Sequence, residues 1–292
     1  MTRPGRLVVV ATPIGNLGDL SPRAVRALAE AEVIACEDTR RTRQLLSHAG
    51  VPAPELVAVH DHNEARQVRT LLRRLERGQR VVLVSDAGMP AISDPGERVV
   101  AAAATAGFEV EVVPGPSAAL AALVASGLPT GRFCFEGFLP RRGSTRAERM
   151  ALLDTERRTT ILYEAPHRVR ATVAELGQAL GSDRRIAVAR ELTKLHEEVW
   201  RGTLGEAVEH LAASEPRGEY VLVVEGAPVP AEPEVADVEA ALRTRLEAGL
   251  DKKAAIAAVA SELDVPKRLV YELATSLEPR ARPGRRRTPA SP

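Results

Sequence analysis

Aromatic residues, cysteines and long apolar runs are all scarce in this 292-residue sequence. Aromatic residues make up only 3% of the chain, so alanine, valine and leucine must fill a core to which 45% of the residues can contribute. The two cysteines, Cys36 and Cys134, have no paired or metal-type spacing, and predict a reduced, cytoplasmic protein. No stretch approaches the roughly 20 apolar residues of a membrane span, and the N-terminal apolar run is too short for a secretory signal.

An excess of charge of either sign is also missing. The 40 lysines and arginines are balanced by 39 acidic residues, and a net charge of +1 gives no global field that would favour nucleic acid or membrane. Positive charge is concentrated locally, in the loop Leu139–Arg146 and in five arginines of the segment 278–292. We expect this last segment to be a disordered basic tail that is able to grip phosphate non-specifically.

The stretch Val81–Gly96 is the centre of the first half of the chain. It begins with a run of β-branched residues that predicts a buried strand of a parallel sheet, and small, turn-forming residues end that strand. Ligands of open α/β sheets bind beyond the carboxyl ends of the strands, where Asp86 and Gly88 would lie. We expect Ser93–Gly96 to begin the next helix, with Asp94 as a capping residue rather than a functional one.

Polar loops follow the other predicted strands as well. Thr12–Asp19, after the strand Leu7–Val10, has the layout of a phosphate or nucleotide cradle, although it matches neither the Rossmann nor the P-loop pattern. Glu37–Thr42 contains two acids, two hydroxyl groups and two arginines. Either Asp38 or Thr39 can cap the following helix, but capping does not need the whole cluster, so we favour a functional role for it.

A histidine-rich segment follows the third predicted strand. His60 and His62 lie on one face of an extended segment and, with Glu64, they are similar to a metal site. No further ligand stands at a fixed spacing, and Asn63 is an adequate helix cap, so we predict no metal. A polar rim that faces the substrate is the favoured interpretation.

The order of the elements predicts a two-domain α/β protein with a helical extension. Strands and helices alternate through residues 1–116, which predicts a doubly wound parallel-sheet domain. Longer strands in 117–228 predict a second α/β domain with a mixed sheet and a cleft between the two. A proline-rich linker, Ala227–Glu234, precedes three helices in 238–277 that have helix-turn-helix proportions. Contact with RNA and a generic cap on the second domain are equally compatible with these helices.

Eight short motifs follow one another along the chain. They are TPIGN (12–16), EDTR (37–40), HDHNE (60–64), SDAGMPAISDPG (85–96), PGPSA (114–118), FEGFLPRR (135–142), YEAPHR (163–168) and ARELTK (189–194). In this order they resemble the ribosomal RNA small subunit methyltransferase I family, which are bacterial 2′-O-methyltransferases within the tetrapyrrole methylase superfamily. The resemblance runs from about Leu7 to Glu225. Met89 departs from it, because a small hydroxyl residue is expected there, and the tail after Leu277 has no expected counterpart.

The resemblance implies a tetrapyrrole-methylase-like fold with S-adenosylmethionine in the cleft between the two domains, and a homodimer. It also implies 2′-O-methylation of a cytidine in the decoding region of 16S rRNA, within the 30S subunit. The cofactor contacts that it implies are Pro13, Gly15, Asp86, Ala87, Gly88, Ser117, Ala118 and Tyr163, completed by the strand near Val221–Val223.

Ribose methylation of rRNA requires a base for the hydroxyl proton and side chains that bind the rRNA. A ribose hydroxyl is a poor nucleophile at neutral pH, so a base within hydrogen-bond reach should help its reaction. The candidates that we favour are Glu37, Asp38, His60 and His62, ahead of Glu164, His167 and Lys194. The side chains predicted to contact rRNA are Arg40, Arg141, Arg142, Arg168 and Lys194.

Two other functions stay open at this point. One is a methylase of tetrapyrrole precursors that acts on carbon, against which the basic FLPRR loop and the helical extension argue. The other is a non-catalytic rRNA-binding assembly factor with a vestigial cofactor pocket, against which the intact TPIGN, SDAG and PGPSA motifs argue.

Overall fold

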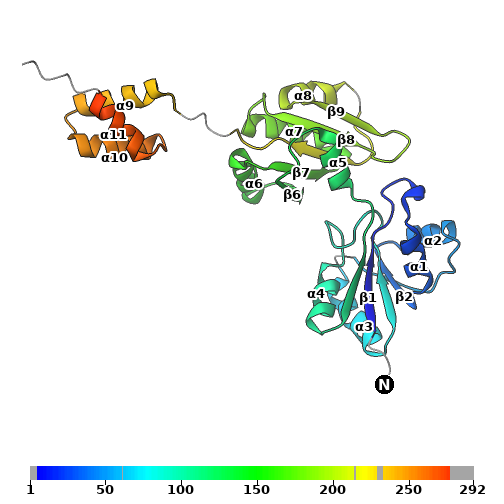
Figure 1. Cartoon of the computed structure of the whole chain (residues 1–292). Helices are drawn as coiled ribbons and strands as arrows, with labels where there is room; N and C mark the ends of the chain where they lie inside the picture. Colours follow the sequence, from blue (N-terminus) through cyan, green and yellow to red (C-terminus); the bar gives the residue numbers. More distant parts are fainter. Residues whose placement is uncertain (1–4, 61, 214, 229–232, 277–292) are drawn as a thin grey trace, which may run out of the picture. The chain divides into compact units, whose positions relative to one another are not determined.

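The protein is described here from a computed structural model, which covers residues 5–60, 62–213, 215–228 and 233–276. The chain divides into two compact units, residues 1–228 and residues 229–292 (Figure 1). Asp61 of the HDHNE motif, part of the predicted linker, and the predicted basic tail at 278–292 lie outside the described residues. Within the described residues, no helix is long and apolar enough to cross a membrane.

The first unit contains two sheets, and the first of them is entirely parallel, as predicted. Its strand order is β3-β2-β4-β1-β5, and all five carboxyl ends therefore lie at one edge. The strands are β1 (Arg6–Val10), β2 (Val33–Cys36), β3 (Glu55–Ala58), β4 (Arg80–Leu83) and β5 (Glu109–Val113). That shared edge brings together the loops that the sequence singled out.

Helices cover both faces of the first sheet (Figure 1). Because side chains alternate along a strand, Val8 and Val10 of β1 pack in the cluster that contains α1 and α2, whereas Leu7 and Val9 pack in the cluster of α3 and α4. The helices are α1 (Pro22–Ala29), α2 (Thr39–His48), α3 (Glu64–Glu76) and α4 (Glu97–Thr105), with a short 3-10 turn η1 (Leu17–Asp19) before α1. The first half of the unit is therefore doubly wound.

The second sheet is mixed, which was also predicted. Its order is β6-β7-β10-β8-β9, in which only the β6–β7 pair is parallel. The strands are β6 (Phe133–Phe138), β7 (Thr159–Glu164), β8 (Arg185–Arg190), β9 (Glu198–Thr203) and β10 (Tyr220–Val224). The helices are α5 (Ala118–Ser126), α6 (Ser144–Thr155), α7 (Pro166–Leu180) and α8 (Leu204–Ala212).

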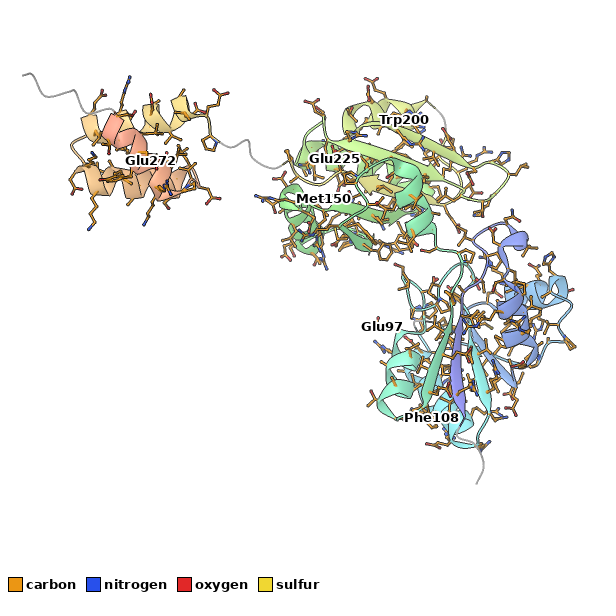
Figure 2. The ribbon with its side chains drawn as sticks, viewed as in Figure 1. Glu97, Phe108, Met150, Trp200, Glu225 and Glu272 are labelled. Carbon is orange, nitrogen blue, oxygen red and sulfur yellow. The ribbon has the colours of Figure 1, made fainter. Side chains whose placement is uncertain are left out.

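Each face of the second sheet has its own core. Met150 of α6 is buried in one of them with residues of α7 and α8, and Trp200 of β9 packs against it (Figure 2). The other face packs against α5, and Ile14, from the loop after β1, belongs to that cluster. This contact joins the two halves of the first unit.

The second unit is a three-helix bundle with a small core of its own. Its helices are α9 (Val235–Glu247), α10 (Lys252–Glu262) and α11 (Lys267–Ser276). Buried Leu242, Val259 and Val270 contribute one large side chain from each helix to that core. Three helices were predicted over this segment, and three are observed.

The helix caps correct one prediction. Ser21 and Ser117 cap α1 and α5, and of the two candidates Asp38 and Thr39 it is Asp38 that caps α2, but the expectation that Asp94 caps α4 is wrong. The residue at the cap position is Gly96, and the acceptor is the carboxylate of Glu64, which receives hydrogen bonds from the backbone N–H groups of Gly96 (2.9 Å) and Arg98 (3.1 Å). Asp94 is thereby left without a capping role.

A second cap differs in detail. Asn63 lies at the start of α3 as predicted, but its side chain makes no hydrogen bond to the first turn of that helix. The amide oxygen accepts from the backbone N–H of His60 (2.9 Å), and the amide nitrogen donates to the carbonyl of Ala58 (3.0 Å). Asn63 thus closes the turn that carries the histidines.

Candidate functional site

Two loops at the carboxyl edge of the first sheet are fastened to each other. Thr12 donates its backbone N–H to the carbonyl of Gly88 (2.9 Å), and Gly88 returns a hydrogen bond to Thr12 (3.1 Å). The buried Thr12 hydroxyl also donates to the carbonyl of Ser85 (3.2 Å). The TPIGN and SDAG motifs therefore form one rigid wall.

Two glycines are required in this wall, Gly88 by its backbone conformation and Gly15 by a close approach. Gly88 has a φ of +81°, a left-handed conformation that favours glycine, and a Cβ there would lie 3.4 Å from a methyl carbon of Ile14. A Cβ on Gly15 would lie only 2.8 Å from the hydroxyl of Thr193, which accepts a hydrogen bond from the backbone of Asn16 (3.1 Å). The ELTK loop after β8 is held against the TPIGN loop in this way.

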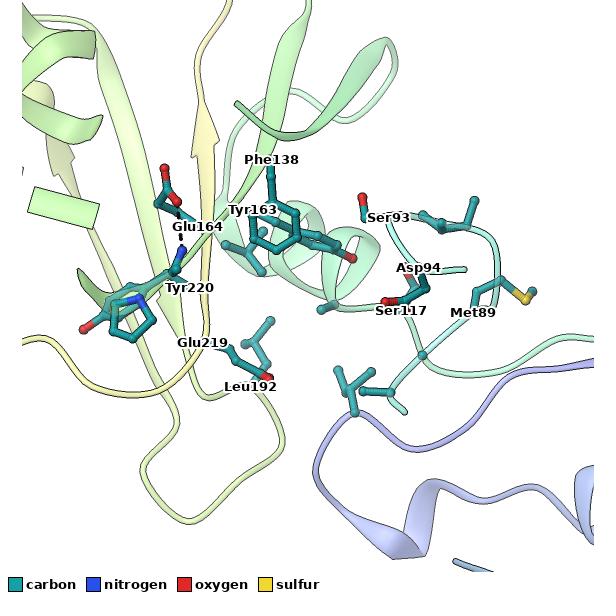
Figure 3. A pocket seen from close by; sticks show the side chains of 18 residues that line it. Met89, Ser93, Asp94, Ser117, Phe138, Tyr163, Glu164, Leu192, Glu219 and Tyr220 are labelled. Atoms are coloured by element: carbon teal, nitrogen blue, oxygen red, sulfur yellow. Dashed lines mark hydrogen bonds between the residues drawn. The ribbon is translucent and has the colours of Figure 1, made fainter. Parts of the chain in front are cut away.

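A cavity of about 280 Å³ lies between this wall and the second sheet (Figure 3). Of the predicted cofactor contacts, it brings together Ala87, Gly88, Ser117, Ala118 and Tyr163. The Tyr163 ring packs edge-on against Phe135 and Phe138, with ring centroids 5.0 and 5.6 Å apart. Burial raises the pKa of the Tyr163 hydroxyl. Val221, on the predicted edge of the pocket, lines the cavity as well.

A second cavity, of about 310 Å³, has a more polar wall. It is lined by the other three predicted cofactor contacts, Pro13, Gly15 and Asp86, together with Arg41 and Lys194. The two cavities share Ile14, Ala87 and Glu219. The predicted cofactor residues are therefore divided between two neighbouring cavities.

Asp86 fastens the EDTR segment. Its carboxylate accepts a hydrogen bond from the backbone N–H of Asp38 (3.1 Å) and pairs with the guanidinium of Arg41 (3.4 Å). Only 16% of the Asp86 side chain is exposed. Its carboxylate is thus occupied by protein groups on the side of the second cavity.

The four predicted proton acceptors lie at the carboxyl ends of two adjacent strands. Glu37 and Asp38 follow β2, and His60 and His62 lie beyond β3, with their rings 6.1 Å apart. Hydrogen bonds from the side chain and backbone of Arg40 lower the pKa of Asp38 to about 2. Asp38 is therefore a weak proton acceptor. Among the described residues, no group of three or more histidine, cysteine, aspartate or glutamate side chains is arranged to hold a metal.

Asp94 is the acidic residue that the sequence interpretation missed. It lines the first cavity, as Ser117 does (Figure 3). Burial, followed by repulsion from Glu37 and Asp86, raises the pKa of Asp94 from 3.8 to about 7, although a hydrogen bond from Ser85 opposes the change. Nothing in the local sequence distinguishes this aspartate from an ordinary cap.

The predicted RNA contacts fall into two groups. Arg141 and Arg142 are exposed on the loop after β6 and make no ion pair with any residue that the structure describes. Arg168, in contrast, is 18% exposed, pairs with buried Glu164 (3.3 Å) and donates to the carbonyl of Leu139 (2.9 Å). Arg168 therefore supports the basic loop from beneath.

Two more of these side chains have protein partners. Lys194 donates from its Nζ to Glu191 and to Glu219, both at 2.9 Å, and lines the second cavity. The exposed Arg40 pairs with Asp38 (2.9 Å) at the surface.

The sequence places Arg146 in the basic loop, but the structure places it in α6, where it is buried. The Arg146 side chain donates to Glu175 (2.6 Å), to the carbonyl of Pro140 (2.9 Å) and to the hydroxyl of Thr172 (3.0 Å). Thr172 in turn donates to Glu164 (2.6 Å), so a continuous polar network connects the loop to the wall of the first cavity. Sequence position alone gave no sign of these partners.

Comparison with known proteins gives consistent matches. The pattern of the family described as Tetrapyrrole (Corrin/Porphyrin) Methylases matches residues 6–208. A protein of Synechocystis sp. named ribosomal RNA small subunit methyltransferase I is 46% identical over 276 residues, which cover 94% of this chain and 99% of that protein. A protein of Xylella fastidiosa with the same name is 51% identical over 78% of this chain and 84% of its own length.

Solved structures agree at the level of the fold. A uroporphyrin-III-C-methyltransferase from Thermus thermophilus superposes with a TM-score of 0.54 at 25% identity, and covers 76% of this chain and 94% of that one. A diphthine synthase superposes with a TM-score of 0.59 at 18% identity, and covers 76% and 90% of the two chains.

Proposed function

The chain belongs to the tetrapyrrole methylase family and, within it, to the ribosomal RNA small subunit methyltransferases I, and from that premise we propose that it methylates the 2′-hydroxyl of a cytidine in the decoding region of 16S rRNA. S-adenosylmethionine is the methyl donor. The observation that carries the proposal is the pair of adjoining cavities, one with mainly apolar walls and the other with a more polar wall that includes Arg41, Asp86 and Lys194. A donor and a polar acceptor can thus meet beside Ile14 and Ala87.

The first cavity fits the donor. Ile14, Ala87 and Val221 offer apolar surface to an adenine or a methionine chain, and Gly88 adds no side chain to that wall. Ser117, at the start of α5, offers a hydroxyl to polar groups. We assign the donor to this cavity, and assign Pro13, Gly15 and Asp86 to its rim on the acceptor side.

Proton transfer is the chemical task left to the chain. When bound, S-adenosylmethionine would supply a methyl group on a positively charged sulfur, and a ribose oxygen that gives up its proton would take that methyl carbon while the sulfur leaves as a neutral thioether. We assign that proton to Glu37, which directly follows β2 at the carboxyl edge of the first sheet, next to the segment that Asp86 holds. His60 and His62 lie beyond the neighbouring strand β3 and line neither cavity, and we assign them to the polar rim that faces the substrate.

The surface charges suit an RNA substrate. Arg141 and Arg142 present planar, permanently charged donors that match phosphate groups, and Arg40 adds a third within the EDTR segment. We assign positioning roles to Arg168 and Lys194, whose charged groups are bound to protein partners. The proposed setting is the cytoplasm, with the 30S subunit as substrate and the protein as a homodimer.

Transfer of a labelled methyl group tests the proposal. Purified protein is incubated with labelled S-adenosylmethionine and 30S subunits from a strain that lacks the corresponding gene, and the labelled nucleotide is identified by mass spectrometry. The proposal predicts label on the ribose of one cytidine of 16S rRNA. Label on uroporphyrinogen but not on 30S subunits would support a tetrapyrrole methylase, and absence of donor binding in calorimetry would support an assembly factor.

A further inference from the structure

Asp94 lies in the wall of the cavity assigned to the donor, where its carboxyl accepts a hydrogen bond from Ser85 and caps no helix. It lines the cavity together with Gly88, Ser117 and Tyr163 (Figure 3). The start of α4, which an aspartate at this position would ordinarily cap, is capped by Glu64 from the start of α3. The Asp94 carboxyl is therefore available to a ligand.

The backbone around Asp94 is held in an unfavourable conformation. Ala91 and Ser93 have φ values of 67° and 60°, in the left-handed region that residues with a side chain rarely adopt. Such conformations persist where the surrounding structure fixes them, and they cluster at ligand sites. Two of them within the three residues before Asp94 support a functional reason for its position.

The charges of the cavity set Asp94 apart from the other acidic residues that line it. Glu164 pairs with Arg168 (3.3 Å), and Glu219 pairs with Lys194 (2.9 Å). Asp94 makes no ion pair within the described part of the chain. Its electrostatic surroundings are the carboxylates of Glu37, Asp86 and Glu219 and the hydroxyl of Ser85. The cavity wall thus carries a negative group with no cation of its own.

We propose that Asp94 supplies the counter-charge for the positively charged sulfur of S-adenosylmethionine, so that the cavity discriminates the donor from its product, S-adenosylhomocysteine. The two molecules share the adenosine, the ammonium and the carboxylate. They differ in the methyl group and in the charge on sulfur, and only that charge is attracted by a carboxylate. This inference rests on the assignment of the donor to the first cavity, as proposed above.

The proposal has a consequence for protons. The pKa of Asp94 in the free protein is raised to about 7, so part of the molecules carries a proton there at neutral pH. A cation in the cavity favours the carboxylate, whereas a neutral thioether does not. Donor binding should then release a fraction of a proton, and product binding should release none.

Titration calorimetry with both ligands tests this at pH 7, in two buffers that differ in ionisation enthalpy. The proteins are the full-length wild type, Asp94→Asn and Asp94→Glu, with Glu97→Gln as a matched control because Glu97 is exposed and lies outside both cavities. We expect Asp94→Asn to weaken donor binding about tenfold or more and product binding less than about threefold. The proton release should vanish with it, while Glu97→Gln keeps the wild-type behaviour.

Several results would overturn the inference. An equal loss of affinity for both ligands in Asp94→Asn would place the carboxyl against a shared part of the ligand and not against the sulfur. Equal proton release by both ligands in the wild type would contradict the inference even if Asp94→Asn does not fold. A preference for the donor over the product that is retained in Asp94→Glu would support it. Failure of the wild type to bind either ligand would instead refute the function proposed above.

Discussion

Three aspartates at one edge of the first sheet have three different surroundings. Asp38 accepts from Arg40, which lowers its pKa to about 2, and Asp86 accepts from the backbone of the EDTR segment. Asp94 is partly buried near three other acids, Glu37, Asp86 and Glu219, and its pKa is raised to about 7. The same side chain therefore stabilises a helix start, fastens a loop, or holds a proton, according to its neighbours.

Replacement of Asp94 should affect stability in a pH-dependent way. The folded pKa of about 7 exceeds the ordinary value of 3.8, so the folded state holds a proton between these values that the unfolded state releases, and stability falls as pH rises through that range. Asp94→Asn should be more stable than the wild type at pH 8, by at most about 4 kcal/mol, with the advantage shrinking towards pH 4. Urea unfolding at both pH values measures this, and an advantage independent of pH would contradict the assigned pKa.

Replacement of Glu37 should affect turnover. If Glu37 accepts the ribose proton, Glu37→Gln should lower the rate of methyl transfer by about 10²–10⁴-fold and leave donor affinity within about threefold of wild type. The adjacent Asp38→Asn is the control, because its carboxylate already serves Arg40 and the start of α2. Single-turnover rates on 30S subunits separate the two, and similar losses in both variants would remove Glu37 from the proposed role.

Residue roles that depend on local contacts could be predicted from the sequence, and those that depend on distant partners could not. Ser21 and Ser117 cap helices that begin directly after them, so the pattern was sufficient. Asp94 resembles such a cap, but the acceptor is Glu64, which lies some thirty residues earlier on a different helix. Arg168 was predicted to contact phosphate, and its two protein partners, Glu164 and the Leu139 carbonyl, come from distant or separate elements that the sequence pattern does not show.

At the scale of elements, the basic loop after β6 is held by hydrogen bonds from two arginine side chains beneath it. Arg146 and Arg168 donate to the carbonyls of Pro140 and Leu139, so the chain that carries Arg141 and Arg142 is fixed from the inside. A fixed loop presents its two guanidinium groups to a phosphate backbone with little loss of conformational entropy on binding.

Removal of the two exposed arginines should weaken RNA binding. Arg141→Ala with Arg142→Ala should lower affinity for 30S subunits about tenfold and reduce the slope of log affinity against log salt by about one to two, with donor affinity unchanged. The control pair is Arg73→Ala with Arg77→Ala, both exposed near the end of α3, far along that helix from the carboxyl edge. Filter binding over a salt series measures the slope, and an equal change in both pairs would make the basic loop a bystander.

The observed element boundaries lie close to the expected ones because apolar runs, and the turn-forming residues that end them, are local signals in the sequence. The β-branched runs became β1, β2 and β4, buried on both faces in the middle of the first sheet. What the pattern could not supply is which loops face each other, since the order β3-β2-β4-β1-β5 places the second and fourth strands side by side. That order brings Asp38 within reach of Asp86.

At the scale of the whole molecule, both cavities are built from the first unit alone. Every residue that lines them precedes position 228, and α9–α11 enclose a separate core. A chain that ends after Pro228 should therefore fold and bind S-adenosylmethionine within about twofold of the full-length affinity. Circular dichroism and calorimetry check this, and loss of donor binding in a folded truncated chain would give the second unit a part in the site.

The central claim is methylation of one ribose in the small-subunit RNA, and a map of 2′-O-methyl groups on 16S rRNA tests it most directly. The map is compared between a wild-type strain, a strain lacking the gene, and that strain supplied with the intact chain or with Glu37→Gln. We predict that one 2′-O-methylcytidine of the decoding region disappears in the deletion strain, returns with the intact chain and is absent or much reduced with Glu37→Gln. An unchanged map in the deletion strain would contradict the account.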